Sequence, residues 1–244
     1  MARIDDLLQA ALKNLPAKPA DSAKQADKKR YSELISEAVA LAIADDLRKR
    51  GLKEARPGAP GEFGDSGAER RMAGGLGAKK VDVTWATEEA GLLLGISIKT
   101  INFKDGKTSN YQKNLVNRRG DMLMEAVTLH RRFPYAVLAA FFFLDKGAET
   151  DNTARRKSTY LNAHARLKLF TGRDDPAGRD EQFERFYLLL LDADPTSSTL
   201  RAYEVGKPEK EIALDEIIMG LLTIVAERNP DFYEVDGDCL RPIT

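Results

Sequence analysis

The distribution of hydrophobic and polar positions predicts alternating helices and strands. Apolar residues recur every three to four positions in the expected helices, and short runs rich in β-branched and aromatic residues mark the expected strands. The predicted helices cover residues 2–14, 31–52, 110–132, 154–169 and 211–228. The predicted strands cover residues 81–85, 92–103, 135–144 and 183–191. The first two strands, joined by a turn, form a hairpin. The third is apolar throughout and lies between helices, which is typical of a buried parallel strand.

This order predicts an α/β fold with a mixed central β-sheet flanked by helices. Residues 1–30 contain a short amphipathic helix and a polar linker with two prolines. We therefore expect an N-terminal helical arm, docked or mobile, ahead of a single domain over residues 31–244. In the first helix of that domain, the face that we expect to be buried is flanked by Ile35 and Ala42 and consists of Leu34, Ala38, Leu41 and Asp45.

Glycines crowd the segment between residues 57 and 77, which predicts a long loop. The run at residues 74–80 is similar to a phosphate-binding loop in its glycine content and its two lysines. Its spacing, however, matches neither a P-loop nor a dinucleotide-binding fingerprint. A flexible loop is therefore the preferred interpretation of the whole segment.

Composition excludes several classes of site. The 244 residues contain one cysteine, Cys239, and two histidines, His130 and His164, so a disulfide framework, a cysteine-based zinc site and a multi-histidine metal centre are ruled out. The longest apolar run is about half the ~20 residues of a membrane helix, and the N-terminus lacks the apolar stretch of a signal peptide. We expect a cytoplasmic protein without membrane contact. The chain has 38 basic and 38 acidic residues, so any nucleic-acid contact must come from local patches.

The predicted hairpin carries polar residues that require an explanation. In its second strand, alternation places Gly95, Ser97 and Lys99 on one face. Asp82 lies in the first strand, and a hairpin brings such residues side by side when they share a face and a register. An aspartate beside a lysine and a serine would begin a polar pocket. The alternative is a solvated sheet face from which Lys99 extends into water.

An acidic residue on one strand, a turn, and an acid-x-Lys pattern late in the next strand form the signature of the PD-(D/E)XK nucleases. With Asp82 and Lys99 in these places, the sequence resembles the restriction-endonuclease-like superfamily over roughly residues 31–145, in the order helix, hairpin, helix, strand. The resemblance implies a Mg²⁺-dependent DNA endonuclease, a restriction or phage-defence enzyme, in which Asp82 ligates the metal and Lys99 positions or activates the attacking water. Magnesium prefers carboxylate and water oxygens, and a bound metal lowers the pKa of its water.

The sequence departs from the family pattern at Ser97, where the second acid should stand. Some members with Ser-x-Lys recruit a carboxylate from the following helix, and that helix offers Asp121 and Glu125. Glu125 lies closer to the apolar helix face and is preferred; a salt-bridged flank with Arg118 is the alternative. The family often adds an acid from its first helix, which makes Glu37 a further candidate ligand, although a solvated glutamate is the plainer interpretation. Without a replacing acid, the chain would be a catalytically degraded DNA-binding or protein-interaction module.

Basic residues gather around the proposed site. Residues 99–132 contain eight basic and three acidic residues, and a second basic cluster follows at 155–157. Such patches suit phosphate backbones, although charge runs also occur on solvated faces. Duplex DNA is the expected partner, and a homodimer would present two active sites to its two strands. Gln112 resembles a glutamine that exonuclease-type members place after their lysine. The candidate DNA contacts are Gln112, Lys113, Arg118 and Arg119.

Overall fold

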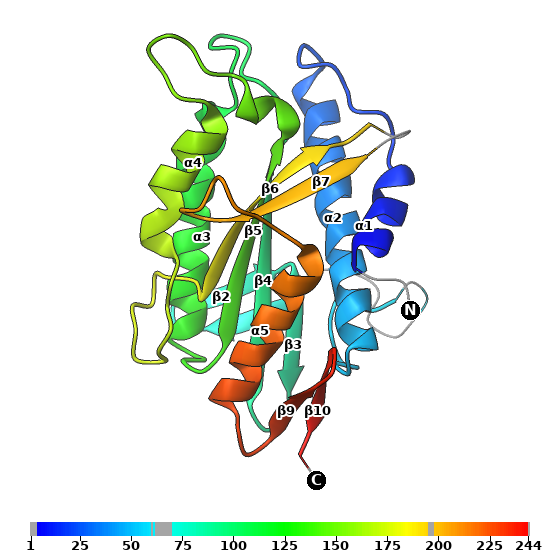
Figure 1. Ribbon diagram of the computed structural model, residues 1–244, viewed down its shortest axis with the longest axis vertical. Coiled ribbons are helices and arrows are strands. Elements are labelled where there is room, and N and C mark those ends of the chain that lie inside the picture. The colour runs from blue at the N-terminus through cyan, green and yellow to red at the C-terminus, as the bar shows by residue number, and fades with distance from the viewer. Residues whose placement is uncertain (1–3, 60, 62–69, 195–197, 244) are drawn as a thin grey trace.

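A computed structural model describes residues 4–59, 61, 70–194 and 198–243. They form a six-stranded mixed sheet flanked by helices, so the predicted α/β class is confirmed (Figure 1). The helices are α1 (Ile4–Lys13), α2 (Gln25–Lys49), α3 (Leu115–His130), α4 (Thr159–Leu167) and α5 (Leu214–Arg228). The strands are β1 (Arg70–Gly74), β2 (Gly77–Val81), β3 (Val83–Thr87), β4 (Gly91–Ile101), β5 (Val137–Asp145), β6 (Arg185–Asp192), β7 (Thr199–Glu204), β8 (Glu211–Ile212), β9 (Tyr233–Asp236) and β10 (Cys239–Pro242).

The main sheet has the strand order β3-β4-β5-β6-β7-β8. Strands β4, β5 and β6 are parallel, and the remaining neighbours are antiparallel. The predicted β3–β4 hairpin and the buried parallel strand β5 are therefore confirmed. Strands β7 to β10 were not predicted, because they are short and partly exposed and leave little apolar periodicity in the sequence.

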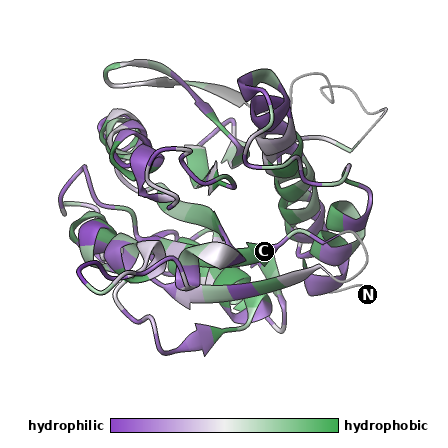
Figure 2. Ribbon diagram, turned by 90° about the horizontal axis from the view of Figure 1, so that it is seen from above, coloured by the Kyte–Doolittle hydropathy of each residue, from purple (hydrophilic) through white to green (hydrophobic). Residues whose placement is uncertain are grey.

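Each face of the sheet supports its own hydrophobic core. Leu94, Ile96 and Ile98 of β4 pack in the core that α1, α2 and α5 cover, as the alternation of β4 predicts. The opposite face packs against α3 and α4. In Figure 2 the hydrophobic colour concentrates on the central strands, whereas the flanking helices also carry hydrophilic residues. No helix within the described residues combines the length and the apolar character that a membrane span requires.

Helix α2 differs from its prediction in its start and in its buried face. It begins at Gln25, six residues earlier than expected. Ile35 and Val39 are fully buried, whereas Leu34, Ala38 and Leu41 are only half-buried. The buried face is therefore centred on the expected flank at Ile35 and Ala42, and not on the line through Leu34, Ala38 and Leu41. The helix is rich in apolar residues on several sides, so its sequence pattern does not select one face.

Helix α1, expected as part of an arm, is docked on the domain. Its Ile4, Leu8 and Leu12 are at most 4% exposed. They belong to the same hydrophobic core as the buried residues of α2 and α5. The spacing of these three residues at intervals of four places them on one helix face, which explains why they are buried together.

Part of the glycine-rich segment is a hairpin and not a loop. Strands β1 and β2 pair antiparallel with Gly74 opposite Gly77, and the N–H of Gly75 donates to the carbonyl of Thr128 in α3 at 2.8 Å. A Cβ atom at Gly74 would lie 2.4 Å from the side chain of Thr128, so glycine permits this close approach. Residues 62–69 of the predicted loop lie outside the described residues. The glycines at 74–77 therefore serve a tight turn and helix contact.

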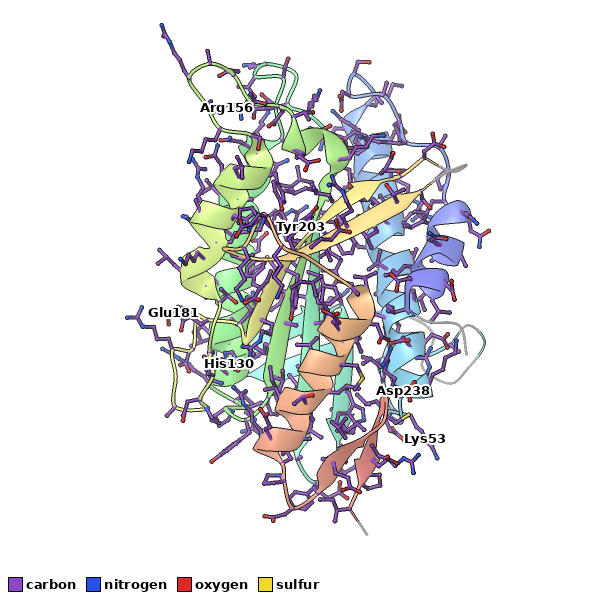
Figure 3. All side chains as sticks on the ribbon, in the orientation of Figure 1. Lys53, His130, Arg156, Glu181, Tyr203 and Asp238 are labelled. Atoms are coloured by element: carbon purple, nitrogen blue, oxygen red, sulfur yellow. The ribbon has the colours of Figure 1, made fainter. Side chains whose placement is uncertain are left out.

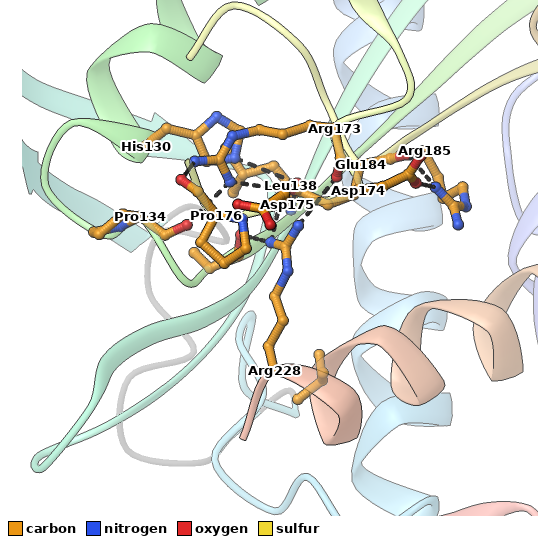
Figure 4. Close-up of polar contacts among 12 residues, drawn as sticks. His130, Pro134, Leu138, Arg173, Asp174, Asp175, Pro176, Glu184, Arg185 and Arg228 are labelled. Carbon is orange, nitrogen blue, oxygen red and sulfur yellow. Dashed lines mark hydrogen bonds and ion pairs between the residues drawn. The ribbon is translucent and has the colours of Figure 1, made fainter. Parts of the chain in front are cut away.

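A buried ion cluster holds the amino ends of β5 and β6 together (Figure 4). Glu184, fully buried, accepts hydrogen bonds from Arg173 at 3.0 Å, from Arg228 at 2.7 Å and from the N–H of Leu138 at 2.6 Å. Its other neighbour is His130, whose Nε2 lies 3.3 Å away. Burial raises the pKa of Glu184, but the histidine and arginine contacts outweigh that effect and lower it. The cluster fastens α3, α5 and the loop before β6 to one end of the sheet.

Candidate active site

The candidate site lies where β4 extends beyond its hairpin partner. Strand β3 pairs with β4 only as far as Ile96, so no described strand covers residues 97–101 on that side. Asp82 stands at the bend between β2 and β3, so its predicted place within the first hairpin strand was wrong. Its Oδ2 accepts the N–H of Ile98 at 2.6 Å, which satisfies one donor of the open edge and fixes the carboxylate there.

Lys99 joins two carboxylates at this edge. Its Nζ lies 3.5 Å from Oδ2 of Asp82 and 3.6 Å from Oε2 of Glu125, which projects from α3. The side chain of Glu125 is 6% exposed, and those of Asp82 and Lys99 are 13% and 17% exposed. The hydroxyl of Ser97 donates to the other oxygen of Glu125. The face of β4 that alternation assigned to Ser97 and Lys99 therefore meets α3 and is not a freely solvated face.

Burial and mutual contacts shift the pKa values of Glu125 and Lys99. Burial raises the pKa of the Glu125 carboxyl, and Lys99 and Ser97 offset only part of that effect. Burial also lowers the pKa of Lys99, but the carboxylates of Glu125 and Asp82 outweigh it and raise the pKa above its ordinary value. Lys99 is thus held as an ammonium, while the ionised form of Glu125 is incompletely compensated.

A cleft of about 960 Å³ opens onto the cluster between α2, β4 and the segment after β4. Asp82 and Lys99 are part of its lining. Its acidic lining residues are Glu33, Glu37, Asp82 and Asp105. Its basic lining residues are Lys28, Lys29, Arg30, Lys80, Lys99, Lys104, Lys113 and Arg118. The cleft thus combines a mainly basic wall with the Asp82 carboxylate at one place, and Glu125 lies behind Lys99 outside the described lining.

The structure brings together four of the predicted site residues, namely Asp82, Ser97, Lys99 and Glu125. Asp121 lies outside the cluster: its side chain is 60% exposed and pairs with Arg118 at 3.8 Å. One helical turn separates it from Glu125 along α3, but the two differ by about 40° around the axis, which leaves Asp121 toward solvent.

The other predicted residues lie around the cleft or away from it. Glu37 lines the cleft from α2, but it is exposed, and no described hydrogen bond or ion pair joins it to the cluster. Lys113 and Arg118 also line the cleft. Arg119 instead lies over the ring of Phe170, 5.7 Å from its centroid, and Gln112 does not belong to the described lining.

Sequence reasoning missed the contribution of α2 to the basic wall. Lys28, Lys29 and Arg30 line the cleft, although the sequence assigned them to a polar linker. The signal was present as three consecutive cations. They occupy the first two turns of a helix, where the helix dipole disfavours positive charge, and Lys29 pairs with Glu33 at 3.7 Å.

The donor set fits magnesium. Among the described residues no group of three or more Asp, Glu, His or Cys side chains is placed to hold a metal ion. Two carboxylates nevertheless suffice for Mg²⁺, which commonly keeps several waters and completes its octahedral shell with substrate phosphates. Asp82 and Glu125 are the residues that would hold it. Compared with protein-family models, with curated proteins and with solved structures, the chain has no significant match.

Proposed function

We propose that this protein is a Mg²⁺-dependent DNA endonuclease with a restriction-endonuclease-like core. The observation that carries the proposal is the Lys99 ammonium between the carboxylates of Asp82 and Glu125, beside a basic cleft. The order α2, β3–β4, α3, β5 supports the same assignment, since it is the expected order of helix, hairpin, helix and strand. A restriction or phage-defence role and a homodimer that cuts both strands of a duplex belong to this proposal.

Each residue of the cluster has a task in phosphodiester hydrolysis. Asp82 and Glu125 would hold the metal, and Ser97 orients Glu125 through its hydroxyl. The chemistry that Mg²⁺ would supply there is polarisation of the phosphoryl group and a more acidic water. Lys99 holds its ammonium beside the reacting phosphate, where it stabilises the negative charge that grows in the transition state. Its raised pKa keeps it charged for this task.

A specific observation supports a second candidate function, a DNA-binding module that has lost its activity. Ser97 stands where the family carries its second acid, and only two carboxylates meet Lys99 among the described contacts. A basic cleft would still bind phosphates without a working metal site. The two functions differ in one measurable property, which is cleavage.

The deciding experiment incubates a mixed pool of plasmid and phage DNA with the protein and Mg²⁺. The variants are Asp82→Ala, Lys99→Ala and Glu125→Ala, with Asp121→Ala as the matched control from the exposed side of α3. We expect discrete cuts from the wild type and the control, and their loss in the three site variants. Retention of DNA in a gel shift without any cutting would favour the binding module. If the protein neither cuts nor binds DNA, both functions are refuted.

A further inference from the structure

A second hollow, of about 460 Å³, lies outside the proposed active site at the start of α4. Residues 152–158 form most of its lining, including Arg155, Arg156 and Lys157. Figure 3 shows Arg156 at one end of the long axis of the molecule, far from His130 and the buried ion cluster. The proposed nuclease site does not use this hollow.

Hydrogen bonds give the rim of the hollow a defined shape. The carboxylate of Asp151 accepts the N–H of Thr159 at 2.6 Å and its hydroxyl at 2.5 Å. Arg156 donates to the carbonyl of Asp151 and, at 3.2 Å, to that of Lys157. It also lies 3.8 Å from the Asp151 carboxylate. The charge of Arg156 is thus turned toward its own loop.

The cations on either side of Arg156 are available to a ligand. Arg155 and Lys157 are exposed, and neither forms an ion pair with any residue that the structure describes. A phosphate at the hollow would therefore gain two cations without first breaking a protein ion pair. Arginine and lysine both serve as phosphate contacts in sequence-independent binding.

Asp151, which directly precedes the lining segment 152–158, connects the hollow to the active-site cleft. The same Asp151 carboxylate accepts the N–H of Tyr111 at 3.1 Å, and Tyr111 is part of the cleft lining. One hydrogen bond therefore separates the two rims. The loops that carry them, after β4 and after β5, lie together at the same end of the molecule (Figure 1). A chain of phosphates leaving the cleft at this end would pass Arg155 and Lys157.

We propose that Arg155 and Lys157 form a second contact for the backbone of duplex DNA, beyond the segment that enters the cleft. The inference rests on the proposed function only in taking DNA as the ligand of the cleft. It adds that only a duplex longer than the cleft reaches Arg155 and Lys157 and makes all of the phosphate contacts. It also adds that these two residues contribute to affinity and not to the bond-breaking step.

The test measures DNA binding without metal, so that no cutting occurs. Hairpin duplexes of about 6 and about 30 base pairs, roughly 20 Å and 100 Å long at 3.4 Å per base pair, are titrated by fluorescence anisotropy at several salt concentrations. The variant is Arg155→Gln/Lys157→Gln. The matched control, Lys53→Gln/Arg179→Gln, removes the same charges from exposed positions elsewhere, and Figure 3 shows Lys53 at the opposite end from Arg156.

For the long duplex, loss of two phosphate contacts should reduce the slope of log K against log salt by about 1.8, at about 0.9 per contact. Between 50 and 200 mM salt, the wild type should therefore lose about 12-fold more affinity than the variant. The short duplex and the control pair should behave as the wild type does. Equal weakening of both duplexes, equal weakening by the control pair, or no binding of the long duplex by the wild type would overturn the inference.

The result separates this inference from the proposed function. A reduced slope in a protein that never cuts DNA would refute the nuclease and support the second contact. Cutting that is abolished in Lys99→Ala, together with an unchanged slope in the Arg155→Gln/Lys157→Gln variant, would support the nuclease and refute the second contact.

Discussion

Replacing Lys99 with methionine separates metal binding from hydrolysis. Methionine keeps most of the length and the apolar stem of lysine but removes the ammonium that lies 3.5 and 3.6 Å from Asp82 and Glu125. Both carboxylates then lose a competing cation, so the affinity for Mg²⁺ should rise. In the proposed mechanism the reacting phosphate loses a fixed positive charge, so the rate of cutting should fall.

The size of the fall follows from the role of Lys99 as a preorganised charge. Removal of one such group from the place where negative charge develops costs about 2.7–4 kcal/mol, which corresponds to roughly 10²–10³ in rate. The fold should also be weakened, because removing one partner of a buried ion pair costs about 3–5 kcal/mol. The raised pKa of Glu125 reduces that loss, since the carboxyl can take up a proton.

The assay is single-turnover cleavage of labelled duplex DNA at saturating protein, with Mg²⁺ affinity measured separately by calorimetry. Lys113→Met is the control, because Lys113 lines the same cleft but is 65% exposed and pairs with Asp105. It should weaken DNA binding and leave the saturated rate unchanged. A Lys99→Met rate within threefold of the wild type, with the protein folded, would refute the role that we assign to Lys99.

Three further predictions concern the acid at the site, the buried ion cluster and a buried histidine. Glu125→Ala should abolish Mg²⁺ binding in calorimetry, and adding Ser97→Asp should restore part of it, because Ser97 already contacts Glu125; no recovery in a folded double variant would argue against this exchange. Glu184→Gln should lower the free energy of unfolding, measured in urea, by about 3–5 kcal/mol, because two buried arginines lose their carboxylate partner. The control is Asp174→Asn, at a side chain that is 79% exposed. It should change the free energy of unfolding by under about 0.5 kcal/mol. Burial lowers the pKa of His164 to about 4, so stability should fall by up to about 3 kcal/mol as the pH drops from about 6.5 to 4; His164→Asn should flatten that part of the pH–stability curve, and an unchanged curve would contradict the assignment.

The candidate cluster could be anticipated from sequence because it depends on local periodicity. Strand alternation places Ser97 and Lys99 on one face, and helix geometry places Glu125 nearer than Asp121 to the buried side of α3. The structure brings Ser97, Lys99 and Glu125 together with Asp82, as the strand alternation and the helical repeat predict. The contact between Asp82 and the N–H of Ile98 could not be anticipated, because it depends on where β3 stops pairing.

The parts that sequence reasoning missed are those in which local pattern is ambiguous. Helix α2 has apolar residues on several sides, and the packing of α1 and the sheet selects the face of Ile35 and Val39. The turn at Gly74–Gly77 was interpreted as flexible because glycine is common both in loops and in tight hairpins. Short exposed strands carry even less signal, since neither of their faces is strongly apolar.

The charge of the cleft illustrates why composition alone says little about partners. The chain is neutral overall, yet cations from separate segments, such as Lys28 in α2 and Lys104 after β4, line one cleft. Several acids that balance them are committed elsewhere, as Glu184 is in its buried cluster and Asp151 is in its loop. Local potential depends on where the folded chain places its unpaired charges. The proposed DNA binding should therefore depend steeply on salt despite a net charge of zero.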